Sequence, residues 1–353
     1  MHADVAPPAQ SGGHAYGRGF PGGLLESARL TSRLGWFVYV AIAVGAALVY
    51  WGVAWSEGTL PSRAGVIHLA LPTFAFVGLP ALAWFNWLAR RALSTARPLL
   101  TDDPAEQRSL ERRLTTMPTR LVVGAGVLGL LALMLLTAFQ PGDTYQRLQI
   151  FVTPVASVME AVFQVMTWLG VGIGGVEIAR KLWVIDDIYR NRIEISVLRP
   201  GPLSAFSRLA SGMVIFTLAM VVLGTLALRE LASTSLWLIG GGIPTVLAAV
   251  AFVAPLWAGH RLMAQERGRN IDALNEHIET TVAQLRAGVD AGQLDQIAPL
   301  NAALDGLIAA RNEYQAVSTW PWQRSTLGGV ITALAAPLAI WVITRVLEGV
   351  RIP

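Results

Sequence analysis

The run IFVTPVASVMEAVFQVMTWLGVGIGGVEIARK, residues 150–181, decides the fold because it is apolar, long enough to cross a membrane, and carries Glu160 within it. A helix of roughly 20 residues spans the hydrocarbon core of a bilayer. Polar residues and a glycine recur along this run at steps of three and four, so a helix places them on one face. They are Thr153, Ser157, Glu160, Gln164, Thr167 and Gly174.

Glu160 needs an explanation because a carboxylate inside a membrane span is costly. It lies about ten residues from the outer end of the predicted span, hence about 15 Å deep and close to the bilayer midplane. Such a group usually faces a bundle interior or a water-filled cavity, and it is a functional candidate. The alternative is a protonated glutamic acid that only hydrogen-bonds a neighbouring helix.

The composition places the whole chain in the membrane class. Its 353 residues are 54% hydrophobic and 14% charged, with a mean hydropathy of +0.51, values that a water-soluble domain of this length does not normally show. The net charge of +4 comes from basic residues spread between apolar runs, so no nucleic-acid partner is expected. The chain lacks cysteine, and its 27 basic residues include a single lysine, Lys181, which we interpret as genome composition.

Seven apolar runs have the length needed to cross about 30 Å of hydrocarbon, which predicts an all-α polytopic transmembrane bundle. With the N-terminus in the cytoplasm, most basic residues fall on the cytoplasmic side, as the positive-inside rule requires. We therefore expect a multi-pass protein of the bacterial inner membrane with a cytoplasmic N-terminus. The last run ends in Arg345 and Glu348, so the alternative for it is a re-entrant segment. The runs cover residues 36–55, 65–89, 120–139, 150–176, 209–228, 234–258 and 326–346.

The chain divides into four parts. Residues 1–30, rich in Gly, Pro, Ala and Ser, are expected to form a disordered tail. Residues 31–258 contain six spans, and residues 323–353 contain the seventh span and the C-terminus. Between them, residues 259–322 carry heptad-like apolar repeats that predict an antiparallel, coiled-coil-like helical hairpin in the cytoplasm. The repeats are Ile271, Leu274, Ile278, Val282, Leu285 and Val289, then Leu300, Leu304, Leu307, Arg311 and Tyr314.

Two further features concern helix packing and the membrane surface. Beyond Glu177 the fourth run continues as an amphipathic segment, whose basic residues, Lys181 among them, are expected to meet lipid headgroups. Glycines on the third and fourth runs allow helices to approach closely. These are Gly124, Gly126 and Gly129, and Gly170, Gly172, Gly174 and Gly175.

Further candidate residues lie on other runs. Thr245, which follows Pro244 in the sixth run, comes out at the predicted depth of Glu160. His68 and Arg345 lie near the outer interface, where they would line a vestibule or a gate. Metalloprotease, serine-hydrolase and P-loop motifs are absent from the sequence, and no set of His and carboxylate residues has metal-ligand spacing. We therefore expect no enzymatic activity, no metal and no cofactor.

Two functions from different classes are open. The leading hypothesis is an ion channel or a proton- or cation-coupled transporter with a polar pathway along span four, in which Glu160 binds the ion. The alternative is a non-enzymatic scaffold or sensor that recruits a partner through the hairpin. In both, membrane lipid surrounds the bundle, and copies of the chain would associate through glycine-rich helix faces or the hairpin. The neutral ligands of the leading hypothesis are Gln164, Thr167, Ser157 and Thr245.

Overall fold

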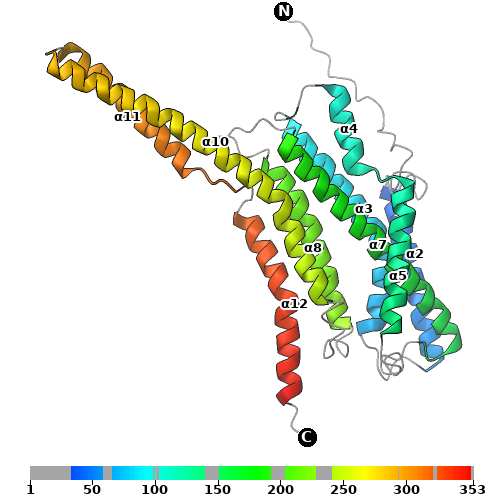
Figure 1. Ribbon diagram of the computed structural model, residues 1–353. Coiled ribbons are helices and arrows are strands. Elements are labelled where there is room, and N and C mark those ends of the chain that lie inside the picture. The colour runs from blue at the N-terminus through cyan, green and yellow to red at the C-terminus, as the bar shows by residue number, and fades with distance from the viewer. Residues whose placement is uncertain are drawn as a thin grey trace, which may run out of the picture.

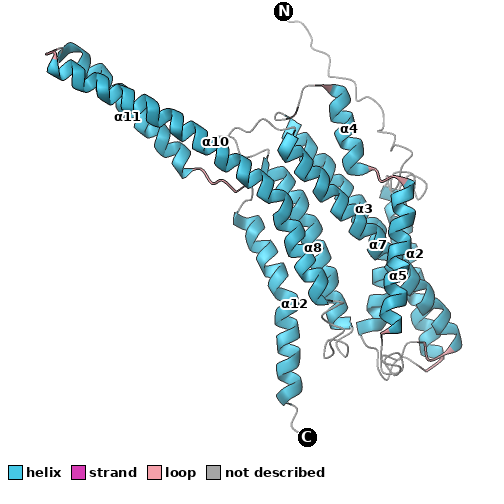
Figure 2. Ribbon diagram, in the orientation of Figure 1, coloured by secondary structure: helices cyan, strands magenta, loops and turns pink. Residues whose placement is uncertain are grey.

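The computed structural model describes residues 33–58, 66–97, 100, 103–139, 151–191, 203–227, 241–292, 294–320 and 324–350. Every regular element in these ranges is a helix, which confirms the predicted all-α class (Figure 1 and Figure 2). The predicted N-terminal tail, residues 1–30, lies outside the described residues. In chain order the helices are α2 (Arg33–Ser56), α3 (Val66–Ala96), α4 (Pro104–Thr115), α5 (Thr119–Ala138), α7 (Pro154–Asn191), α8 (Leu203–Ala227), α10 (Ile243–Asp290), α11 (Leu294–Ala316) and α12 (Arg324–Val350).

Six of these helices are long and apolar enough to cross a membrane, which is compatible with a multi-pass membrane protein. They are α2, α3, α5, α7, α8 and α10, and each overlaps one of the first six predicted runs; residues 234–240 of the sixth run lie outside the described residues. The seventh predicted run lies in α12, which is not among the six, so its full crossing stays a prediction. Apolar side chains point outward, such as Phe37 (74% exposed) and Met134 (67%). Apolar surfaces of this extent would cause aggregation in water, and contact with lipid tails would cover them.

The interior of the bundle contains two hydrophobic clusters. One joins α4 to α3, α7, α8 and α10, and includes Leu114, Ile185 and Phe206; we call this side the α4 end. The other joins α2 to the first halves of α3 and α7, and includes Tyr50 and Phe163; we call this side the far end. The two ends therefore hold different sets of helices together.

Helices α5 and α7 touch through glycine. A Cβ atom added to Gly172 would lie 2.2 Å from the carbonyl oxygen of Ala125, and one added to Gly129 would lie 2.0 Å from that of Trp168. No side chain fits into such a contact between backbones, so the predicted packing role of these two glycines is confirmed. The contact also aligns the two helices, because it sets the middle of α5 against Gly172.

Helix α10 continues well beyond the bundle. It has 48 residues, hence a length of about 72 Å, and its second half projects away from the bundle (Figure 1). The chain turns at Ala291 and Gly292, and α11 runs back beside α10. Close to the bundle, the Arg267 guanidinium donates to the Gln315 carbonyl at 2.7 Å. We call residues 264–316 the projecting pair; their cytoplasmic location stays a prediction.

The glycine contact predicts that Gly172→Ala lowers the free energy of unfolding by about 1–3 kcal/mol, because the added methyl group forces two backbones apart. Equilibrium unfolding of the detergent-solubilised protein measures this change. Gly175→Ala is the matched control on the same helix, since an added Cβ there meets nothing within 4 Å. The control should be neutral or stabilising by up to about 1 kcal/mol. Equal stability of the two variants would contradict the close contact.

Candidate functional site

Glu160, the acid that the sequence singles out, is buried in α7 with 2% of its surface exposed. The Tyr50 hydroxyl of α2 donates a hydrogen bond to Oε1 at 3.0 Å, and the backbone N–H of Phe151 donates to Oε2 at 2.5 Å. Phe163 packs edge-on against Tyr50, with ring centroids 5.6 Å apart. Both carboxylate oxygens thus have a donor inside the protein, as a buried acid requires.

The segment just before α7 explains how a backbone N–H reaches this acid. Phe151 takes a left-handed φ of 56°, which is uncommon for a residue other than glycine. Glu57, directly after α2, caps the start of α7 by accepting the Thr153 hydroxyl at 2.5 Å and the Ala156 N–H at 3.0 Å. The hydrogen bond from Thr153, together with the N–H bonds, holds the pKa of Glu57 below its usual range.

Glu160 lies nearer to the N-terminus of α7, at the far end of the bundle, than to the middle of this helix. It is six residues after the first residue of α7, about 9 Å along the helix. Gly172, which meets the middle of α5, is twelve residues further, about 18 Å. The midplane depth expected from the sequence stays a prediction; residues 151–153 precede the helix, and the Phe151 N–H reaches back to the carboxylate.

His68 lies beside the same tyrosine. Its ring is nearly parallel to the Tyr50 ring, with centroids 6.1 Å apart and planes at 14°. The side chain is 2% exposed, and neither ring nitrogen has a hydrogen-bond partner in the described part of the chain. Buried polar atoms are normally paired, so this histidine calls for an explanation. We call Glu160, Tyr50 and His68 the Glu160 cluster; the sequence predicts His68 as a separate gate, without the link through Tyr50.

The other predicted site residues have different surroundings. Ser157 and Thr245 each donate their hydroxyl to the carbonyl four residues earlier in the chain. The Thr167 hydroxyl is buried and has no partner among the described residues, and Gln164 is half-buried. Arg345 lies in α12, but its side chain falls outside the described part of the chain. Their roles as ligands or gate therefore stay predictions.

A second set of buried charges lies at the α4 end of α7. Lys181 is 0% exposed and Glu177 is 1% exposed, and their side chains form an ion pair of 2.7 Å. The Lys181 ammonium also donates to Asn86 Oδ1 of α3 at 2.7 Å and to the Leu114 carbonyl of α4. Three N–H donors thus meet three oxygens from three helices. We call these four residues the Lys181 cluster.

Arg180 also binds Glu177 and the C-terminal end of α4. Its guanidinium donates to Glu177 Oε2 at 2.9 Å and to the Arg113 carbonyl in the last turn of α4. Carbonyls in the last turn of a helix lack intrahelical partners and carry partial negative charge. Arg180 and Lys181 therefore cap the C-terminus of α4 and hold it against α7. An ion pair of 2.9 Å between Arg113 and Asp187 strengthens this attachment.

The continuation of the fourth run as a helix beyond Glu177 is confirmed, but the expectation that Lys181 meets lipid headgroups is wrong. Its surroundings give a reason for the single lysine of the chain: a compact ammonium fits between three acceptors, whereas a planar guanidinium needs a flatter and wider site. The sequence contained a signal for this ion pair, because Glu177 and Lys181 are four residues apart, a spacing that suits an ion pair on a helix. One helical face carries, at seven-residue steps, Glu160, Thr167, Gly174 and Lys181.

The helices define only a class, an all-helical chain whose apolar helices are compatible with a multi-pass membrane protein. No protein-family model, curated protein or solved structure matches the chain. No group of three or more His, Cys, Asp or Glu side chains suited to a metal ion occurs among the described residues.

The Lys181 cluster predicts that Lys181→Met lowers the free energy of unfolding by about 3–5 kcal/mol. Asn86 Oδ1 and the Leu114 carbonyl lose this donor, and Glu177 keeps only Arg180 as a cationic partner. Lys181→Arg should restore little of this stability, since the guanidinium does not fit the three acceptors. Denaturant unfolding followed by tryptophan fluorescence measures both. The control is Arg190→Met, which removes an ion pair from a side chain 65% exposed and should cost no more than about 1 kcal/mol. Wild-type stability in Lys181→Arg would refute the three-acceptor explanation.

Proposed function

We propose that the chain is a non-enzymatic membrane protein that recruits a partner protein through the projecting pair, the cytoplasmic helical hairpin predicted from the sequence. The observation that carries this proposal is the incomplete burial of the seam between α10 and α11. Met263 is the last buried apolar side chain that the structure describes on α10. Beyond it, the two helices pack mainly on each other.

The apolar residues of this seam are half-buried. In a pair of helices the seam residues are covered mainly by the facing helix, and a further helix would cover the side that stays open. An amphipathic helix of a partner is the usual occupant of such a surface. The half-buried residues are Ile271, Leu274, Ile278, Val282, Leu285, Leu300, Leu304 and Leu307.

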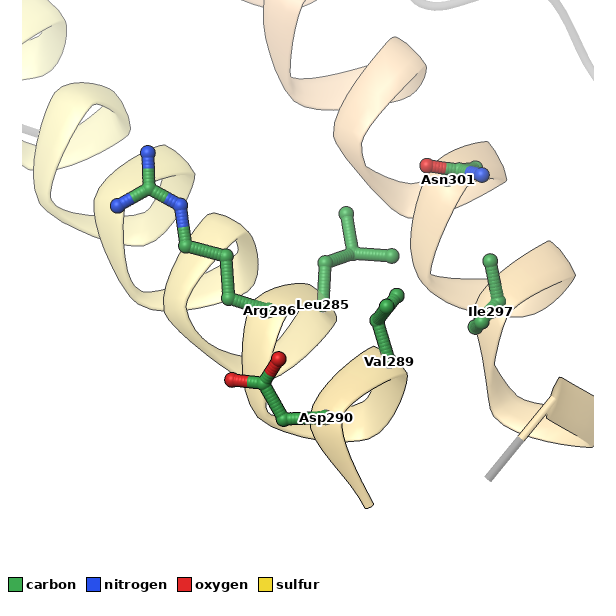
Figure 3. A pocket seen from close by; sticks show the side chains of 6 residues that line it. All are labelled: Leu285, Arg286, Val289, Asp290, Ile297 and Asn301. Carbon is green, nitrogen blue, oxygen red and sulfur yellow. The ribbon is translucent and has the colours of Figure 1, made fainter. Parts of the chain in front are cut away.

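Near the turn the seam opens into a groove, which Figure 3 shows from close by. Leu285 and Val289 of α10 lie across it from Ile297 of α11, and the cavity measures about 500 Å³. Val289 is 57% exposed, although its position in the heptad belongs to the seam. The groove holds no buried charge, so it suits apolar side chains of a protein rather than a small polar substrate.

Charge favours a basic partner over a second copy of the chain. Between residues 270 and 306 the projecting pair carries six exposed acids and one arginine, Arg286, a net charge of −5. Two copies in one membrane would project side by side and bring these acids together, which costs free energy, whereas a basic helix meets opposite charge. The acids are Asp272, Glu276, Glu279, Asp290, Asp295 and Asp305.

A proton-coupled function is the second candidate, and the Glu160 cluster favours it. An acid inside a membrane bundle is a functional candidate by default, and proton relays are built from such acids and histidines. Here Glu160 shares Tyr50 with His68, whose nitrogens have no partner in the described residues. A hydrated cation needs an open path, whereas a proton moves along hydrogen bonds. Because the carboxylate is 2% exposed, we place proton exchange above cation conduction.

The hairpin proposal predicts that a photo-crosslinking amino acid at Arg286, on the rim of the groove, forms an adduct with a partner protein in cells. Val289→Asp should lower its yield at least about tenfold, because a charge in the groove costs more than about 1.4 kcal/mol of binding. Val289 is exposed, so this change leaves the fold intact. Leu274→Asp with Leu307→Asp should abolish the adduct. The crosslinker at Arg269, nearer the bundle, is the control and should not capture that partner; absence of an adduct at Arg286 rejects the proposal.

The proton proposal predicts that Glu160→Gln lowers proton flux into proteoliposomes at least about tenfold, the usual scale for losing a positioned proton-transfer group. Tyr50→Phe should lower the flux as well, since it removes the hydroxyl that joins the cluster. Glu276→Gln, on the projecting pair, is the control and should not change it. A flux unaltered by Glu160→Gln removes this acid from any proton path and leaves it a packing role.

A further inference from the structure

We infer that a groove between α3 and α8, at the α4 end of the bundle, binds the headgroup of an anionic phospholipid. The groove has a cavity of about 180 Å³, to which α3 contributes Arg91 and Thr95 and α8 contributes Arg208. Its remaining lining is apolar and includes Leu88 and Leu209. This site is independent of the projecting pair and of the Glu160 cluster.

The two arginines lie at the same level of the bundle. Arg91 is five residues before the last residue of α3, and Arg208 is five residues after the first residue of α8, which packs against α3. Both side chains are exposed. Under the predicted topology, these helix ends lie at the cytoplasmic interface. Basic pockets between helices at this level are suited to anionic headgroups.

Within the described residues, no acid compensates the charge of this groove. Neither Arg91 nor Arg208 forms an ion pair within the described part of the chain. Their neighbours differ, since Arg90 pairs with Glu111 at 3.4 Å and Arg180 pairs with Glu177. Two guanidinium groups that line one cavity repel each other, and an anion placed between them removes this repulsion. A phosphate also matches the hydrogen-bonding fork of each guanidinium.

The surroundings of the groove favour a lipid over a soluble phosphate. Arg91 lies over the ring of Trp87, 5.3 Å from its centroid, and Trp87 is 52% exposed, as expected for an aromatic residue at the membrane interface. Further into the bundle, the two helices close together, since a Cβ added to Gly212 would lie 2.8 Å from the Leu88 side chain. The groove is therefore shallow, with charge at its mouth and an apolar floor, which suits a headgroup whose tails lie along α3 and α8.

The test titrates the full-length protein in neutral detergent with phosphatidylglycerol or phosphatidylcholine of the same chains, with bound lipid counted by native mass spectrometry. Phosphatidylglycerol should bind more tightly. Arg91→Gln with Arg208→Gln should weaken its binding about 25-fold, roughly fivefold for each arginine, and leave phosphatidylcholine binding unchanged. Arg91→Lys with Arg208→Lys keeps the charge and should keep most of the affinity. Thermal unfolding without added lipid confirms that the variants are folded.

The matched control is Arg190→Gln with Arg269→Gln, two exposed arginines that each pair with an acid on their own helix. This control should bind phosphatidylglycerol as the wild type does. Equal affinity of the wild type for the two lipids, or unchanged phosphatidylglycerol binding in Arg91→Gln with Arg208→Gln, would overturn the inference. Displacement of the lipid by millimolar inorganic phosphate would also overturn it, because the groove would then recognise a free phosphate rather than a membrane lipid.

Discussion

The burial of Lys181 and Glu177 constrains the α4 end of the molecule, because charges taken out of water must find partners inside the protein. An ammonium has three N–H donors, and here the acceptors come from α3, from α4 and from α7 itself. The position of α4, and with it the place where the chain enters α5, therefore depends on Lys181 together with Arg180 and the Arg113–Asp187 ion pair. Removing any of the three oxygens would leave a buried donor unpaired, so these helices are held as a set.

The far end of α7 meets the same constraint in a different way. Among the described residues, no basic side chain donates to Glu160; its oxygens accept from the Tyr50 hydroxyl and from the Phe151 backbone N–H. Glu177, by contrast, is held by two cations, Arg180 and Lys181. The contrast explains why we assign packing to the Lys181 cluster and keep proton exchange for the Glu160 cluster.

The outer surface changes character along the molecule. Apolar side chains cover the bundle, a surface compatible with contact with lipid tails, whereas the projecting pair carries exposed acids and a half-buried seam. Arginines also fall into two groups: Arg113 joins α4 to α7 through Asp187, and Arg180 does so through the Arg113 carbonyl, whereas Arg91 and Arg208 face a groove and form no ion pair with the described residues. The first group stabilises the protein, and the second is free to meet a ligand.

The sequence by itself determined the class of the fold, because hydropathy is local and bilayer thickness sets the length of a span. It predicted the first six apolar helices, the continuation of α7 and the close approach at Gly129 and Gly172, and it singled out Glu160 as a candidate. Only the tertiary structure decided that Tyr50, 110 residues earlier in the chain, donates to that acid, and that Lys181 lies inside. Which residues of different helices meet depends on how each helix is rotated and shifted along its neighbours. Backbone contacts such as that at Gly172, and end caps such as Glu57, set these rotations and shifts, and hydropathy does not encode them.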